Sequence, residues 1–328
     1  MTSLQNWQEL LKQGINNTAD LLSHLQLDPV DVPEALLPTQ PFKMRVPLGF
    51  VARMQIGNPH DPLLRQVLPI ADEHKLSSDF TRDPLNENIS NPVPGLLQKY
   101  KTRVLLTISG ACAINCRYCF RRHFPYSDNN PGMNGWMAAI DYIRARPDIS
   151  EVIFSGGDPL TAPDNFLATL ANHLASIPHV TTLRIHTRMP IVLPERINNE
   201  FIDWFTGSRL KPVLVTHCNH PQEIDTSVAY AARCLQQAGV LLLNQSVLLK
   251  GINDNVSILT TLSNKLFECH ILPYYLNLLD KVEGTAHFDL PQTTAIALHQ
   301  ELLAHLPGYL VPRLIREIPG KPSKTLIR

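Results

Sequence analysis

The sequence lacks an excess of charge, a signal peptide and a membrane-spanning segment, and each absence excludes a class of protein. Its 29 basic and 29 acidic residues cancel, so nothing favours a nucleic-acid or membrane-surface partner. The first 13 residues are polar with scattered apolar ones, and no apolar run approaches the length of a membrane span. There is also no low-complexity tract and no short-period repeat. We therefore expect a cytoplasmic protein with no nucleic-acid or membrane partner.

Short strand-like segments alternate with helical ones after residue 100. Six runs rich in Val, Ile and Leu are the expected strands: Arg103–Ser109, Glu151–Ser155, Thr181–Thr187, Pro212–Cys218, Val240–Leu248 and Cys269–Leu276. The expected helices are Asn134–Ala145, Pro163–Ser176, Pro194–Thr206, Ile224–Ala238, Asn255–Phe267 and Pro291–Leu306. Six strand–helix units in a row predict an α/β fold with a parallel sheet, open or curled into a barrel. Right-handed crossovers then place the functional loops at the carboxyl ends of the strands.

The segments before and after this pattern look different. Leu4–Lys12 and Thr18–Leu27 have the pattern of short helices, and a proline-spaced stretch follows them to about residue 100. After the last expected helix, the apolar stretch Tyr309–Ile318 leads into the tail Pro319–Arg328. We therefore divide the chain into an N-terminal helical extension that packs on the barrel (1–100), a core barrel (101–290), and a C-terminal helix with its tail (291–328).

Three cysteines on one short loop form the most informative motif. Cys112, Cys116 and Cys119 have C-x3-C-x2-C spacing and follow the first expected strand directly. Three thiolates can hold three irons of a four-iron, four-sulfur cluster and leave the fourth iron open for a small molecule. A zinc site would need a fourth ligand, and no Cys or His pair follows at zinc-finger spacing. We therefore predict a [4Fe-4S] cluster, with structural zinc or uninvolved thiols as the alternatives.

A glycine-rich turn follows the second expected strand and consists of Ser155, Gly156, Gly157 and Asp158. The two glycines let the backbone approach a ligand closely, and Asp158 offers a carboxylate. Such a turn is weak evidence alone, because Gly-Gly-Asp is common in turns. One strand downstream of the cysteine loop, it favours a small-molecule site.

These two motifs resemble those of radical S-adenosylmethionine (SAM) enzymes, and further segments resemble the lysine 2,3-aminomutase family. The similar segments, in family order, are Arg103-Val-Leu-Leu106, Cys119-Phe-Arg-Arg122, Thr216-His-Cys-Asn-His-Pro221, Asn244-Gln-Ser-Val-Leu-Leu249, Asp280 with Gly284 and His287-Phe288, and Pro319-Gly-Lys-Pro-Ser-Lys324. The resemblance implies a radical SAM partial (β/α)6 barrel with an N-terminal helical extension. It also implies three cofactors: a [4Fe-4S] cluster, SAM, and pyridoxal 5′-phosphate (PLP) on the short C-terminal tail.

The resemblance assigns cofactor roles to single residues. Lys324 matches the lysine that carries PLP, although Lys321 in the same loop competes with it. Arg103 matches a ligand of the PLP phosphate, and a planar guanidinium suits phosphate oxygens. The turn 155–158 matches the motif that meets the amino group of SAM.

It also assigns substrate roles. Arg121 matches the arginine that binds the substrate carboxylate, and Asp280 matches the acid that binds the side-chain ammonium of lysine. Glu317 stands where the family has a second aspartate. The resemblance therefore implies the type of reaction more closely than the identity of the substrate. Two carboxylates would read the length and charge of a diamino acid, because an unpaired buried ammonium is costly.

Other cysteines and polar residues have no partner spacing typical of a metal site. We interpret Cys218, Cys234 and Cys269 as small buried thiols in apolar segments. Structural or cofactor-contacting hydrogen bonds are expected for His217, His220, His287, Asn244 and Gln245.

The chain resembles most a shorter bacterial branch of the family, which supplies β-lysine for modification of elongation factor P. The resemblance implies an isomerase that converts L-lysine to β-lysine, with the R isomer as the product. It further implies a reduced flavodoxin- or ferredoxin-type electron donor and a functional link to elongation factor P and its β-lysine ligase. Long family members carry a C-terminal zinc-binding extension; here the chain stops soon after Lys324 and Asn255 replaces one family cysteine, so we expect no structural zinc.

Three other functions remain open from the sequence. The nearest is the same chemistry on another amino acid, such as glutamate or arginine, although Asp280 and Glu317 would repel the side chain of glutamate. The second is a radical SAM activase that acts on a protein and needs no PLP. The third is a non-catalytic electron-transfer or scaffold protein, whose cluster would bind no SAM.

Overall fold

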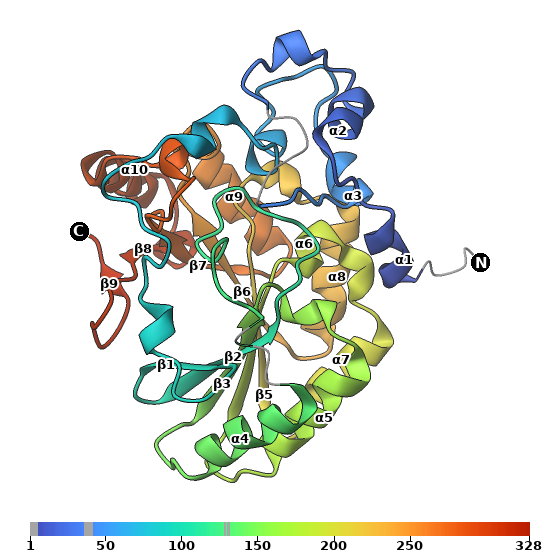
Figure 1. Ribbon diagram of the computed structural model, residues 1–328, viewed down its shortest axis with the longest axis vertical. Helices are drawn as coiled ribbons and strands as arrows, with labels where there is room; N and C mark the ends of the chain where they lie inside the picture. Colours follow the sequence, from blue (N-terminus) through green and yellow to red (C-terminus); the bar gives the residue numbers. More distant parts are fainter. Residues whose placement is uncertain (1–5, 36–41, 128, 130–131) are drawn as a thin grey trace.

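Nine strands form a single sheet whose spatial order is their order in the sequence (Figure 1). The computed structural model describes residues 6–35, 42–127, 129 and 132–328. The strands are β1 (Leu96–Tyr100), β2 (Arg103–Ser109), β3 (Glu151–Gly156), β4 (Thr182–Thr187), β5 (Lys211–Thr216), β6 (Leu241–Val247), β7 (Leu272–Asn277), β8 (Arg313–Arg316) and β9 (Thr325–Leu326). Strands β2 to β8 are parallel, and β1 and β9 pair antiparallel at the two edges. No pairing joins β1 to β9 within the described ranges, so the sheet is a barrel with an open seam.

Helices follow the parallel strands in the order that the sequence predicts, and they lie along the outer side of the sheet (Figure 1). The longer helices are α4 (Gly132–Arg144), α5 (Asp164–Ala175), α7 (Asn199–Thr206), α8 (Thr226–Gln237), α9 (Val256–Glu268) and α10 (Gln292–His305). Short helices complete the barrel: η5 (Pro159–Thr161), α6 (Met189–Val192), η6 (Pro194–Arg196), η7 (Pro221–Glu223), η8 (Ala286–Phe288) and η9 (Gly308–Leu310). The six expected strands correspond to β2–β7, and the predicted partial (β/α)6 barrel is confirmed, with β8 as a seventh parallel strand.

The strands alternate between two environments. In β2, Val104 and Leu106 point outward and are almost completely buried under the helices, while their neighbours Arg103 and Leu105 face the barrel lumen and keep some exposure. Successive side chains of a strand point to opposite faces, so each strand contributes one row to the core and one to the lumen. The lumen is therefore the place where polar side chains of several strands meet.

Side-chain caps fix where the helices begin. Asn198 accepts a hydrogen bond from the backbone N–H of Phe201 at the start of α7. Asp225 and Asn255 cap α8 and α9 in the same way. Such caps satisfy backbone donors that the first helical turn leaves unpaired. They direct each chain crossover back along the outside of the sheet. None of the helices in the described ranges has the length and hydropathy of a membrane span.

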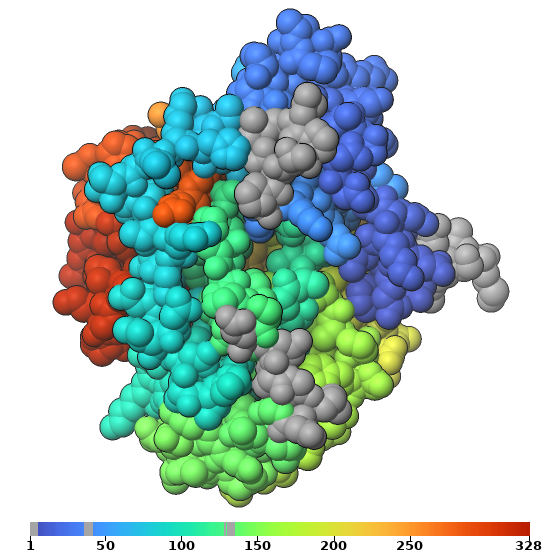
Figure 2. Space-filling model, viewed as in Figure 1, coloured from blue at the N-terminus to red at the C-terminus, as the bar shows by residue number. Residues whose placement is uncertain are grey.

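The first 100 residues are more irregular than a helical extension. They contain short helices, namely α1 (Trp7–Lys12), α2 (Thr18–His24), η1 (Pro29–Asp31), α3 (Leu48–Val51), η2 (Leu64–Gln66), η3 (Ala71–His74) and η4 (Glu87–Ile89). The start of the expected helix Leu4–Lys12 lies outside the described residues. The segment ends in β1, which the sequence did not predict. Apolar side chains such as Trp7 and Leu21 share one core with barrel residues such as Phe154. Figure 2 shows the cyan part of this segment between the red C-terminal residues and the green residues of the cysteine loop.

Candidate active site

The cysteine loop leaves the carboxyl end of β2 and presents three free thiols. Cys112, Cys116 and Cys119 are all partly exposed. Burial raises the pKa of the Cys119 thiol to about 11, and the nearby sulfur of Cys116 adds to the shift. Burial likewise raises the pKa of Cys112, with Cys119 as the next cause. Burial and the neighbouring sulfur atoms both disfavour the thiolate forms of Cys112 and Cys119, and a bound cation would favour them.

The glycine-rich turn at the end of β3 packs directly on the cysteine loop. A Cβ at Gly157 would lie 2.5 Å from the carbonyl oxygen of Ala111, and one at Gly156 would lie 2.4 Å from that of Ser109. Gly156 also has a φ of +124°, which side chains rarely permit. The two turns are joined by the hydrogen bond from Gly157 N–H to Ser109 C=O (2.6 Å). Both glycines are therefore required for the close approach of two backbone segments.

The Asp158 carboxylate holds this turn together. It accepts hydrogen bonds from the Thr187 hydroxyl (2.7 Å), from the backbone N–H of Arg188 (2.8 Å) and from that of Leu160 (3.0 Å). Burial raises its pKa, against the effect of these donors. Its oxygens are committed to protein donors, so Asp158 shapes the turn in which Ser155 and the glycines face the site.

Arg121 is held by a carboxylate from the N-terminal segment. Its Nε and Nη2 donate to the two oxygens of Glu87 (2.7 and 2.8 Å), and Nη1 donates to the Ser155 hydroxyl and the Gly156 carbonyl (3.2 Å each). Arg121 and Glu87 are both buried. Burial opposes the ionisation of Glu87, but the charges of Arg121 and Lys99 outweigh it and lower the pKa of Glu87 to about 2. A guanidinium has five N–H donors, so one remains for a ligand.

A second pair of arginines on the cysteine loop shares one buried carboxylate. Arg117 forms a two-point ion pair with Glu73, and Arg122 contacts the same carboxylate. Arg117 is completely buried. Two cations on one carboxylate fix the loop from the side opposite the sheet.

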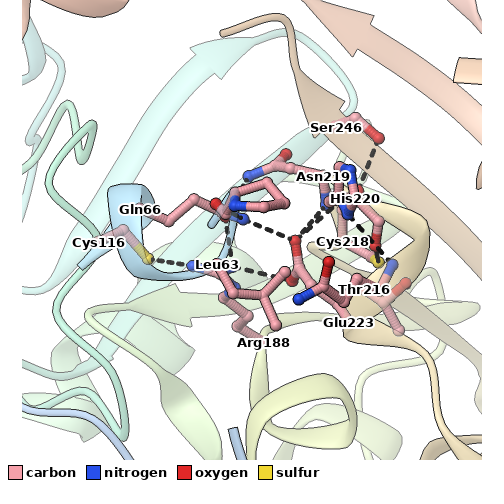
Figure 3. A network of polar contacts seen from close by, with 12 residues as sticks. Leu63, Gln66, Cys116, Arg188, Thr216, Cys218, Asn219, His220, Glu223 and Ser246 are labelled. Carbon is pink, nitrogen blue, oxygen red and sulfur yellow. Dashed lines mark hydrogen bonds and ion pairs between the residues drawn. The ribbon is translucent and has the colours of Figure 1, made fainter. Parts of the chain in front are cut away.

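A fourth arginine, Arg188 after β4, belongs to the network of polar contacts in Figure 3. Its Nη1 donates to Sγ of Cys116 (2.8 Å), and its Nη2 donates to Gln66 Oε1 (2.7 Å) and Glu223 Oε2 (2.9 Å). Gln66 also accepts from the Asn219 amide (3.1 Å). The network joins η2, the ends of β4 and β5, and the cysteine loop.

Lys324 projects toward the lumen on the other side of the site. Its Nζ lies 3.3 Å from Glu317 Oε2 and 3.4 Å from Asn277 Oδ1, and 5.4 Å from the centre of the Tyr275 ring. Lys321, the competing lysine, is exposed. Burial opposes the ionisation of Glu317, but Lys324 and Lys99 outweigh it and lower the pKa of Glu317.

Asp280 follows β7 and faces the same space. Its carboxylate accepts no hydrogen bond and forms no ion pair with any residue that the structure describes. Burial raises its pKa to about 7, while the charge of Lys324 opposes the shift and that of Glu317 adds to it. A carboxylate in such surroundings gains most from an added cation.

Arg103, at the start of β2, offers an unpaired guanidinium to the lumen. It stacks 4.2 Å from the centre of the Tyr100 ring. In the described part of the chain it has no carboxylate within ion-pair distance. An arginine of this kind is suited to bind a phosphate.

Two histidines line the lumen between these groups. His217 contacts the Gln245 side chain (2.8 Å between Nε2 atoms), and His186 lies beside it with a buried Nε2 that has no partner in the structure. Burial lowers the pKa of His217 to about 3, so the ring is neutral. Asn244 finds its expected partners in Thr216 and Cys218. His220 caps η7, and both ring nitrogens of His287 are buried with no hydrogen-bond partner in the part of the chain that the structure describes.

Comparisons with known proteins agree with this arrangement. The model of the radical SAM superfamily matches residues 106–207. The chain is 49% identical to the L-lysine 2,3-aminomutase of Haemophilus influenzae, over 98% of this chain and 95% of that protein. It is 48% identical to the L-lysine 2,3-aminomutase of Escherichia coli, over 98% of this chain and 94% of that protein. The chain belongs to the lysine 2,3-aminomutase family.

A solved radical SAM methyltransferase from Sphaerobacter thermophilus is also similar, with a TM-score of 0.45 and 17% identity over 67% of this chain and 68% of that one. The assignment of the barrel fold therefore depends on the strand order and not on this similarity.

The family identifies this protein as an isomerase, with a [4Fe-4S] cluster, SAM and PLP as its cofactors. The donor sets fit these groups. Three neighbouring thiols that need a cation suit a cluster, which binds each cysteine through a different iron. Among the described residues, no three His, Cys, Asp or Glu side chains lie close enough to bind one metal ion. A cluster does not require such a group, because each cysteine binds a different iron. The unpaired Arg103 and the lumen-facing Lys324 suit the phosphate and the aldehyde of PLP.

Besides barrel residues such as Arg188, Glu223 and His186, four residues of a single segment escaped the sequence analysis: Gln66, Glu73, Glu87 and Lys99. All four belong to the N-terminal segment, where no periodic pattern or motif surrounds them. The only available signal was the run of arginines at 117, 121 and 122, because buried cations require counter-ions from elsewhere in the chain.

Proposed function

We propose that this protein is an L-lysine 2,3-aminomutase that converts (S)-α-lysine to (R)-β-lysine. One observation carries the choice of substrate: the Asp280 carboxylate lies in the lumen near Lys324, and no side chain among the described residues pairs with it. The side-chain ammonium of lysine would supply the missing cation, with Glu317 as the second acid. The names of the relatives that cover nearly the whole chain support the same substrate.

The remaining lumen groups suit the other end of the substrate. Arg121 keeps one N–H for the α-carboxylate, and its bonds to Glu87 fix its direction. Arg103 would bind the phosphate of PLP, and Lys324 would bind its aldehyde. When bound, SAM at the reduced cluster supplies a 5′-deoxyadenosyl radical, and PLP supplies the carrier on which the amino group moves between neighbouring carbons. The protein thus orients lysine from both ends and excludes water between them.

The biological destination of the product is part of the proposal. The family branch that this chain resembles makes β-lysine for elongation factor P, and the chain spans nearly the full length of two bacterial relatives. We therefore assign elongation factor P and its β-lysine ligase as functional partners, and a reduced flavodoxin- or ferredoxin-type protein as electron donor.

An anaerobic assay tests the activity. Cluster-reconstituted protein would be incubated with PLP, SAM, a strong reductant and L-lysine, and the amino acids separated by chromatography with mass spectrometry. β-Lysine that requires SAM, PLP and Lys324 supports the proposal, and chiral separation identifies the isomer. Cleavage of SAM without β-lysine would contradict the choice of lysine, and would direct the assay to other amino acids or to a protein substrate.

A further inference from the structure

A lysine side chain crosses the seam of the open barrel. Lys99 lies on the edge strand β1, and its Nζ contacts Glu87 Oε1 (3.0 Å) on one side and Glu317 Oε1 (2.8 Å) on the other. Glu317 follows β8, next to the opposite edge strand β9, and lies 218 residues away in sequence. Only 18% of the Lys99 side chain is exposed, and the two carboxylates are more buried still. Lys99 thus links the two edges that backbone pairing leaves apart.

The contacts of Lys99 belong to a row of alternating charges. Arg121, Glu87, Lys99, Glu317 and Lys324 follow one another, each within ion-pair distance of the next. The row joins the group assigned to the substrate carboxylate with the group assigned to PLP. Glu87 and Lys99 are the two members that neither sequence motifs nor family resemblance assigns to a role, and Lys99 is the one that contacts Glu317.

Glu317 divides its oxygens between two lysines. Oε1 faces Lys99 and Oε2 faces Lys324. A lysine committed to PLP no longer offers its ammonium to Glu317, so Oε2 becomes available while Oε1 stays on Lys99. A buried carboxylate with one fixed oxygen and one free oxygen presents a directed acceptor to an incoming cation.

We propose that Lys99 is a positioning residue for substrate recognition: it fixes Glu317 across the seam so that the free oxygen Oε2 faces the side-chain ammonium of lysine. The proposal rests on the proposed function above. Lys99 touches no substrate atom, so it acts through Glu317. Removing it would leave two neighbouring buried carboxylates without their shared cation, and Glu317 would turn away or take up a proton.

Ligand binding without radical chemistry tests this role. PLP-loaded protein without SAM or reductant is titrated with L-lysine and with L-norleucine, which has the same carbon chain and α-amino group but no side-chain ammonium. The visible absorbance of the bound PLP reports binding. In Lys99→Met, we expect the preference for lysine over norleucine to fall about tenfold. Norleucine binding should be unchanged, because Glu87 loses Lys99 but keeps both hydrogen bonds from Arg121. Lys99→Arg keeps the cation and should retain most of the preference.

A double variant separates positioning from general structural support. In the Glu317→Gln background, Lys99→Met should reduce the preference no further. Equal weakening of both ligands would overturn the proposal, since the effect would then come from the fold or from Arg121. An unchanged preference would overturn it too, and so would a raised one, because removal of a cation alone strengthens the attraction for an ammonium. If Lys99→Met does not fold, Lys99→Gln replaces it. Failure of the proposed function is recognised separately, as a wild-type protein that does not prefer lysine to norleucine.

Discussion

The two sides of the active site are held in different ways. On the cysteine-loop side, three buried arginines are each paired with a buried carboxylate: Arg117 with Glu73, Arg121 with Glu87, and Arg188 with Glu223. On the tail side, Lys324 keeps 22% of its side chain exposed and Asp280 has no partner among the described residues. The charged groups on the cysteine-loop side are paired before any ligand binds, whereas the tail side has a carboxylate that can still pair with a ligand.

The difference follows from what each side must do. A cluster and its SAM need fixed geometry, and paired buried charges resist movement because separating them leaves a charge unsolvated. In the proposed function the tail must instead exchange partners, since Lys324 would leave Glu317 when it reacts with PLP. We therefore expect substitutions on the loop side to reduce stability, and substitutions on the tail side to reduce activity at nearly constant stability.

The largest effect is expected for the tail lysine. Lys324→Ala should reduce β-lysine formation by at least about a thousandfold, because the group that we propose to bind the PLP aldehyde is lost. The melting temperature of the ligand-free protein should change little, since Lys324 is partly exposed and Glu317 keeps Lys99 as its partner. The exposed Lys321→Ala is the matched control and should keep its activity and the visible absorbance of bound PLP. Loss of PLP absorbance in Lys321→Ala alone would reverse the assignment of the two lysines.

On the cysteine-loop side, we expect a substitution to reduce the stability of the protein. Glu73→Gln leaves Arg117 and Arg122 buried without their carboxylate, and we expect the free energy of unfolding to fall by about 3–5 kcal/mol. Denaturant unfolding of the ligand-free protein measures this change. Asp72→Asn, one residue earlier, removes an exposed ion pair with Lys75 and should be neutral within error. Similar unfolding curves for the two variants would mean that the buried ion pairs do not stabilise the cysteine-loop side more than an exposed pair does.

At Asp280, a single variant allows the effect on activity and the effect on stability to be compared. Its pKa of about 7 means that lysine binds best above pH 7, where the acid is already ionised, and that affinity falls as pH drops below 7. Asp280→Asn should lower kcat/KM for lysine about 100-fold and abolish this pH dependence.

The stability of Asp280→Asn should change in the opposite direction. A folded pKa above the unfolded value means that the folded protein binds the extra proton, so stability falls as pH rises from about 4 to 7. Removing the acid should therefore raise the free energy of unfolding at pH 8 by an amount on the order of 3 kcal/mol. Below about pH 4 the difference should vanish. Equal stability at every pH would mean that Asp280 is already neutralised by a protein cation.

Much of the fold could be predicted from the sequence because its signals are local. Runs of Val, Ile and Leu mark the buried parallel strands, and residues such as Asp225 and Asn255 mark helix starts. The strand β8 was missed because only four residues, with arginine at both ends, form it. β1 was missed because it ends a proline-spaced stretch that has no strand pattern of its own.

In the candidate site, too, residues with a local sequence signal could be predicted and the others could not. Residues within motifs, such as Arg121 and Lys324, could be named from sequence, and the structure brings them to one lumen. Their counter-ions could not, because pairs such as Lys99 with Glu317 join positions 218 residues apart and leave no local pattern. Only the folded chain shows which carboxylate reaches which cation.

The smallest effect is expected where the two sides meet, at Glu317. Glu317→Asp keeps the charge, as in the family's usual aspartate, but a side chain shorter by one methylene cannot keep its contacts with Lys99 and Lys324 together. We expect KM for lysine to rise about three- to tenfold with kcat nearly unchanged, because one charge-assisted hydrogen bond is lengthened and none is removed from the reacting atoms. Steady-state kinetics on lysine measure the change, with Glu317→Gln as the more severe comparison. A fall in kcat with unchanged KM would instead place Glu317 next to the reacting carbons, and would assign the recognition of the ammonium to Asp280 alone.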